Sequence, residues 1–68
     1  MGEKSAEWSR IQGTLSGRLS EEEQRIVAAL VEGKSLPEIG RMLGQHRSMI
    51  WRKAQNIRAR ALAAERGR

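Results

Sequence analysis

Two helical patterns meet in residues 36–52, LPEIGRMLGQHRSMIWR, with a short break between them. Pro37 stands in the first turn of the earlier pattern, where a missing N–H has no helical partner to lose. Gly44 is free to adopt the positive φ that ends many helices, and Gly40 is small enough to let two helices approach closely. This spacing predicts two helices joined by a tight turn, which is a helix-turn-helix motif.

The residues after the break predict a long helix from about 46 to 63. Its apolar positions recur at intervals of four, three and four, as one side of a helix requires. These positions are Ile50, Ala54, Ile57 and Ala61. The helix before the break is only about eight residues long, so it must be held by its neighbours. We expect Ile39, Met42 and Leu43 to form its buried face. Met49 is likewise expected to fill the core.

A further helix is predicted over residues 20–32. Ser20 and Glu23 have the spacing of a capping box, in which each side chain bonds the backbone N–H of the other residue. Three consecutive glutamates suit the positive end of the helix dipole there. The apolar stripe consists of Ile26, Val27, Leu30 and Val31. Ser35 and Glu38 repeat the capping-box spacing, which marks the start of the short helix.

The two ends of the chain carry weaker patterns. Trp8, Ile11 and Leu15 are spaced three and four apart, which predicts a short helix and a loop over residues 1–18. We expect this helix to lay Trp8 over the main body, because a large exposed aromatic is unusual in a soluble monomer. Residues 64–68 have little to bury and are predicted to form a flexible basic tail.

Length and composition limit the possible functions. At 68 residues the chain forms one small domain, which we expect to be all-α, with three to four helices and the helix-turn-helix unit in residues 19–63. There is no cysteine, aspartate or tyrosine and one histidine, so most metal-ligand sets and catalytic constellations cannot be assembled. We expect no enzyme activity, metal or cofactor. The longest apolar run, residues 26–31, is too short for a membrane span or a secretory signal, which predicts a cytoplasmic protein.

Charge is divided unevenly along the chain. Residues 1–38 contain seven glutamates and five basic residues, a balance of −2, whereas residues 39–68 contain eight basic residues and one glutamate, a balance of +7. A basic half of this kind is typical of a protein that binds a polyanion such as nucleic acid. The alternative is a solvated helix surface that only keeps the protein soluble.

Residues 19–44, LSEEEQRIVAALVEGKSLPEIGRMLG, are followed by an arginine-rich helix that ends in IRARAL at 57–62. This arrangement resembles region 4 of bacterial RNA polymerase sigma factors and the LuxR-type response-regulator domain. The matching positions are Leu19, Ser20, Glu23, Val27, Leu30, Glu32, Gly33, Ser35, Glu38, Ile39, Leu43, Gly44, Ile50 and residues 57–62. The resemblance covers most of the chain and implies a three- or four-helix DNA-binding module.

The same region also shows a second similarity and three departures. The similarity, to the amino-terminal domain of one group of insertion-sequence transposases, rests on Ser48, Ile50 and Arg52. Gln45 stands where families of this kind usually place an apolar residue, and His46 where they place a serine or threonine cap. Trp51 is a rare choice on the outward face of the long helix.

The outward face of the long helix carries the predicted contacts. If this helix enters the major groove of DNA, its first turns point at base edges. The expected base contacts are His46, Arg47, Ser48, Trp51, Arg52 and Gln55. Arg47 and Arg52 are the principal base readers, because arginine pairs with guanine O6 and N7. The expected phosphate contacts are Lys34, Arg41, Lys53, Arg58 and Arg60. The alternatives are solvated charges for the arginines, a helix-start role for His46, and packing of Trp51 against other apolar side chains or a partner chain.

Together these features predict a protein that binds double-stranded DNA sequence-specifically and regulates transcription. A single domain of this kind contacts little DNA surface, so a homodimer is expected. The apolar residues left for its interface are Trp8, Ile11 and Leu62. Two alternatives stay open. The chain is a docking module for RNA polymerase or a regulator, as sigma region 4 is, or it is the DNA-recognition part of a transposase.

Overall fold

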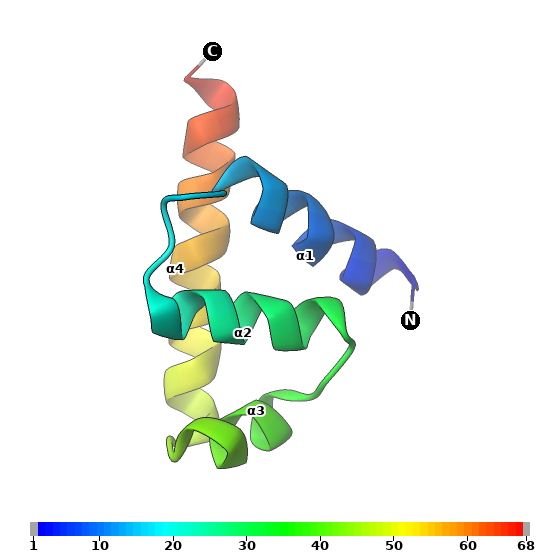
Figure 1. Cartoon of the computed structure of the whole chain (residues 1–68), viewed down its shortest axis with the longest axis vertical. Helices are drawn as coiled ribbons and strands as arrows, with labels where there is room; N and C mark the ends of the chain where they lie inside the picture. Colours follow the sequence, from blue (N-terminus) through cyan, green and yellow to red (C-terminus); the bar gives the residue numbers. More distant parts are fainter. Residues whose placement is uncertain (1, 68) are drawn as a thin grey trace.

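Figure 1 shows a computed structural model of the chain, which describes residues 2–67 and the side chains from residue 6 onward. Over these residues all regular structure is helical, in four helices: α1 (Gly2–Thr14), α2 (Glu21–Val31), α3 (Leu36–Leu43) and α4 (Arg47–Arg66). The three shorter helices follow one another along α4. The first, α1, crosses its C-terminal half, α2 crosses its middle, and α3 lies at its N-terminal end (Figure 1). The predicted all-α fold is confirmed.

Local hydrogen bonds fix where α2 and α3 begin. Ser20 Oγ accepts from the Glu23 N–H at 3.2 Å and Glu23 Oε1 accepts from the Ser20 N–H at 2.9 Å, so the predicted capping box is confirmed. Ser35 Oγ accepts from the Glu38 N–H at 3.3 Å, which supplies one of the two bonds predicted for the second box. The Glu38 carboxylate lies 3.8 Å from Lys34 Nζ instead, because that ammonium offers it an opposite charge.

Two clusters of buried side chains hold the helices together. One joins α1, α2 and α4 and consists of Trp8, Ile11, Leu15, Val27, Ala54, Ile57 and Ala61. The other joins α2, α3 and α4 and consists of Ile26, Ala29, Ile39 and Ile50. The predicted apolar stripe of α4 is therefore buried along its length. Trp8 covers the main body as expected, with 8% of its surface exposed.

Two methionines predicted to lie in the core are at the surface. Met42 is 54% exposed and Met49 is 42% exposed, so this prediction is wrong for both. Successive residues of an α-helix are rotated by about 100°. Met49 directly precedes the buried Ile50, and Met42 stands between the exposed Arg41 and the half-buried Leu43. Each methionine therefore lies at the edge of the buried stripe of its helix.

The C-terminal end of α4 extends further than its sequence indicates. The helix continues to Arg66 instead of ending about one turn earlier, where the flexible tail was predicted to begin. Its last turn is held by α1, because the Glu65 carboxylate lies 3.1 Å from the Arg10 guanidinium and accepts from the Thr14 hydroxyl at 3.3 Å. Residue 68 of the predicted tail lies outside the described residues.

The packing of α1 also corrects the predicted dimer interface. Trp8 and Ile11 are only 8% and 5% exposed, because both are buried against α2 and α4 of the same chain. Leu62 is 50% exposed. Of the three residues predicted for the interface, Leu62 alone is at the surface.

Candidate nucleic-acid interface

The turn between α3 and α4 is tight. Gly44 ends α3 with a φ of 69°, in the left-handed region that glycine adopts without strain. The Gln45 N–H donates to the Gly40 carbonyl at 2.8 Å, and a Cβ at Gly40 would lie 2.5 Å from the Gln45 carbonyl oxygen. Both glycines are therefore required by the backbone, as predicted, and they fix how closely α3 approaches the start of α4.

His46 and Ser48 form the start of α4. His46 is the N-cap residue: its Nδ1 accepts from the Ser48 N–H at 3.1 Å and lies 2.8 Å from the Ser48 hydroxyl oxygen. A short oxygen-bearing side chain usually takes this role, and the geometry agrees with the alternative that His46 is a helix-start residue. Because Nδ1 is used by the cap, Nε2 is the ring atom left to meet a ligand.

The other predicted base contacts lie on the outward side of α4. Ser48, Arg52 and Gln55 recur at intervals of four and three, opposite the buried stripe; the first two are exposed and Gln55 is half-buried. Arg47 is exposed as well, and Trp51 exposes 55% of its surface. The first three turns of α4 therefore present these five side chains on one continuous surface.

Trp51 and Gln55 border a hollow of 570 Å³ between α4, α1 and the connection from α2 to α3. Its apolar wall consists of Trp8, Leu30, Leu36, Pro37 and Ala54. The hollow accounts for the exposure of Trp51, because the indole stands at its edge and is not enclosed by the core.

Asn56 belongs to the same surface and was missed by the sequence prediction. It is exposed and follows Arg52 by four residues, which places the two side chains one above the other on a helix. A side-chain amide is the group that pairs with adenine N6 and N7 in the major groove. The four-residue spacing from Arg52 is the signal that could have identified it.

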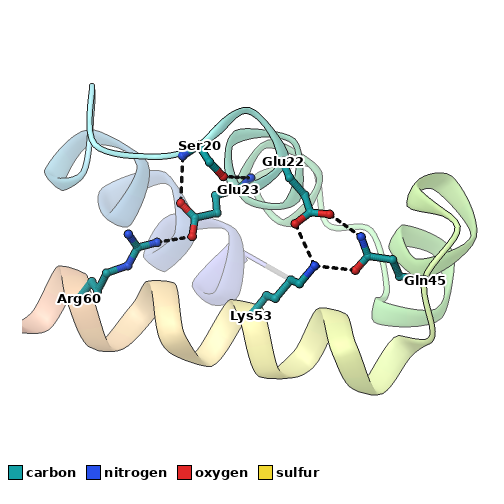
Figure 2. A network of polar contacts seen from close by, with 6 residues as sticks. All are labelled: Ser20, Glu22, Glu23, Gln45, Lys53 and Arg60. Carbon is teal, nitrogen blue, oxygen red and sulfur yellow. Dashed lines mark hydrogen bonds and ion pairs between the residues drawn. The ribbon is translucent and has the colours of Figure 1, made fainter.

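The acidic first turn of α2 holds two basic side chains of α4 (Figure 2). Glu22 Oε1 accepts from Lys53 Nζ at 2.8 Å, and Glu23 Oε2 accepts from the Arg60 guanidinium at 2.6 Å. Gln45 completes the first contact, since its Oε1 accepts from Lys53 Nζ at 2.9 Å and its amide N–H donates to Glu22. Both cations were predicted to contact phosphates. In the structure each is instead paired with a carboxylate of its own chain.

Of the three remaining predicted phosphate contacts, two are also paired with carboxylates and one is not. Arg58 lies 3.0 Å from the Glu7 carboxylate, and Lys34 Nζ lies 3.8 Å from carboxylates on either side of it in the sequence. Arg41 is exposed on α3, and within residues 6–67 no carboxylate pairs with it. Arg41 is therefore the member of the predicted set best able to meet a phosphate.

The ion pairs also determine how two glutamates titrate. The hydrogen bond from Lys53, helped by the one from Gln45, lowers the pKa of Glu22 below its ordinary value. The hydrogen bond from Arg60, helped by the Ser20 backbone N–H, lowers the pKa of Glu23. Opposite charge and hydrogen bonds to the ionised form both favour a carboxylate over a carboxylic acid, so both glutamates are charged at neutral pH.

Three basic side chains around the turn have no carboxylate partner within residues 6–67: Arg41, Arg47 and Arg52. Within residues 6–67, the basic side chains without a carboxylate partner are Arg18, Arg25, Arg41, Arg47, Arg52 and Arg66. Arg41 and Arg47 line the same shallow hollow beside the turn, and Arg52 follows in the second turn of α4. The candidate interface therefore consists of the outward face of the first three turns of α4 together with Arg41.

No group of three or more histidine or glutamate side chains among the described residues is arranged to hold a metal ion. None of the described helices is both long enough and apolar enough to cross a membrane. Comparisons of the chain with protein-family models, curated proteins and solved structures found no match.

Proposed function

We propose that this chain is a helix-turn-helix protein that binds double-stranded DNA and regulates transcription. The first three turns of α4 enter the major groove, as the second helix of such a motif does, while α3 crosses the adjoining backbone. Arg47 and Arg52 read guanines, because one guanidinium bonds O6 and N7 together. Gln55 and Asn56 offer amides suited to adenine.

The distribution of ion pairs along α4 carries the proposal. The cations on its two flanks are held by glutamates of the same chain; they are Lys53, Arg58 and Arg60. Arg47 and Arg52 are exposed, and within residues 6–67 they have no carboxylate partner. Their charge is therefore available to a polyanion, and it lies on the exposed side of a helix end, which is the shape that a major groove admits.

Duplex binding is tested by fluorescence anisotropy with labelled random-sequence and genomic duplex pools at several salt concentrations. We expect affinity to fall with salt, because phosphate contacts release counterions, and selection from the pools to enrich one sequence. Arg47→Ala/Arg52→Ala should weaken binding to the enriched sequence by about 30-fold or more, since each arginine contributes about 1–3 kcal/mol of base discrimination.

The matched control is Arg18→Ala/Arg25→Ala. It removes the same charge from two exposed arginines outside α3 and α4, so it should bind the enriched sequence nearly as well as the unaltered protein. Affinity that is indifferent to Arg47 and Arg52, or that falls equally in the control, would contradict the proposal.

A second candidate function is docking to another protein, such as RNA polymerase or one of its regulators. It is favoured by Met42, which is 54% exposed and borders, with Ala28 and Leu43, a hollow of 360 Å³ between α2 and α3. Methionine adapts readily to a partner surface because its side chain is flexible. This candidate requires that the chain bind the purified polymerase and show no sequence preference on DNA. The second result separates it from the first candidate.

A further inference from the structure

Glu22, Gln45 and Lys53 form a closed ring in which each side chain contacts the other two (Figure 2). Lys53 Nζ donates to Glu22 Oε1 at 2.8 Å and to Gln45 Oε1 at 2.9 Å. The Gln45 amide donates to the second carboxylate oxygen. The ring therefore joins the first turn of α2, the turn before α4 and the second turn of α4.

The ring restricts what Lys53 is able to contact. Two of the three N–H groups of its ammonium are directed into the ring, and 32% of its side chain is exposed. A hydrogen bond between an ammonium and a carboxylate is roughly twice as strong as one between neutral groups. The Glu22 charge also repels phosphates that approach the ammonium. One N–H remains outside the ring, so an incoming phosphate competes with Glu22 for the ammonium and also meets the repulsion of its charge.

Lys53 nevertheless lies beside the proposed DNA-binding surface. It directly follows Arg52, rotated by about 100° around α4, and it is four residues beyond the exposed Met49. When a helix occupies the major groove, the sugar–phosphate backbones run along its flanks. The lysine stem is long and flexible, so an ammonium released from Glu22 would reach a phosphate on this flank.

We propose that Glu22 restrains duplex binding by holding Lys53 in the ring, so that removal of the Glu22 charge releases Lys53 to a phosphate. This inference rests on the proposed DNA binding. Phosphate contacts carry no sequence information, so release raises the affinity for every duplex by the same factor. Glu22 thereby limits phosphate binding, and the exposed arginines keep their dominant share of recognition.

The test is the salt dependence of binding to a short random-sequence duplex, measured by anisotropy for Glu22→Gln, Lys53→Gln and the double variant. Glutamine keeps the size and an acceptor oxygen of Glu22 but not its charge. Each added phosphate contact steepens the plot of log affinity against log salt by about 0.9. We expect Glu22→Gln to bind more tightly at low salt and to have a slope steeper by about 0.9 than that of the unaltered protein. Lys53→Gln and the double variant should keep the original slope.

Glu21→Gln is the matched control, because Glu21 is an exposed neighbour in the same turn and within the described residues it contacts no cation of α4. Its slope should stay unchanged. An equal steepening in Glu21→Gln, or in the double variant, would show a general charge effect and overturn the proposal. A shallower slope in Lys53→Gln alone would also overturn it, since Lys53 would then already contact a phosphate.

Circular dichroism establishes that each variant is folded at the temperature of the titration. If Glu22→Gln does not fold, Lys53→Gln carries the test: an unchanged slope is the result that a restrained Lys53 requires, and a slope shallower by about 0.9 overturns the proposal. Absence of salt-dependent binding by the unaltered protein defeats the proposed function and this inference with it. If the unaltered protein binds DNA and Glu22→Gln shows the same salt slope, the restraint by Glu22 is wrong and the proposed DNA binding stands.

Discussion

Single residues set the approach of α3 to α4. A side chain at Gly40 would meet backbone atoms of the turn, with its Cβ 2.5 Å from the Gln45 carbonyl oxygen and 3.4 Å from the Arg47 nitrogen. Backbone atoms cannot move aside as the end of a flexible side chain does. The start of α4, and with it the orientation of Arg47, therefore depends on the absence of a side chain at Gly40.

We expect Gly40→Ala to lower the free energy of unfolding by about 1–3 kcal/mol, which is the usual cost of overpacking. Urea denaturation followed by circular dichroism measures this change. Gly13→Ala is the control, because a Cβ at Gly13 meets nothing within 4 Å and alanine favours a helix over glycine by about 0.5–1 kcal/mol. Equal losses in the two variants would contradict the close approach at Gly40.

Residues governed by local rules could be predicted from the sequence. The cap at Ser20 and the helix end at Gly44 depend on neighbours within a few positions, and both are as expected. The role of Gln45 could not be predicted, because its partner Glu22 is 23 residues away and belongs to another helix. A side chain that bonds across helices leaves no periodic signal in the sequence.

At the level of elements, the first turn of α2 has two roles. Its glutamates lie at the positive end of the helix dipole, and two of them also hold Lys53 and Arg60 of α4. The first role follows from the sequence of α2 alone. The second depends on the crossing of α2 and α4, so the sequence predicted the helices but not the pairs that join them.

Protonation of this turn should destabilise the fold. The pKa values of Glu22 and Glu23 are lowered in the folded protein from their ordinary value of 4.5, so the unfolded chain binds protons more readily. Their contribution to stability is fully present above pH 4.5 and is lost as the pH falls below it, through the lowered values. We expect the urea concentration at the unfolding midpoint to decrease as the pH is lowered through this range, as measured by circular dichroism.

The double variant Glu22→Gln/Glu23→Gln isolates this contribution. Glutamine is accepted at the third position of a capping box, so α2 should keep its start while losing the two titrating groups. The acid-induced fall should then be shallower than in the unaltered protein, and Glu21→Gln should retain the original steepness. If the double variant falls as steeply as the control, its ion pairs do not contribute as described.

At the level of the whole molecule, α4 is divided into two regions. Its C-terminal half is covered by α1 and tied to it through Arg10 with Glu65 and through Glu7 with Arg58. Its N-terminal half carries the exposed surface that includes Arg47 and Arg52. The sequence located the basic half of the chain, but ion pairs with distant residues decide which of its cations stay available, as Lys53 and Arg60 show with partners 31 and 37 residues away.

The two tryptophans give the most direct test of the claim that the first turns of α4 contact DNA. Trp51 is 55% exposed on the proposed surface, whereas Trp8 is 8% exposed in the core. A ¹H–¹⁵N correlation spectrum resolves one indole N–H signal from each during titration with a duplex. We expect the Trp51 indole and the backbone amides of residues 46–56 to shift most, in a salt-dependent manner, and Trp8 to shift little. A spectrum unchanged by DNA, or shifts concentrated in α1 and α2, would contradict contact between DNA and the first turns of α4.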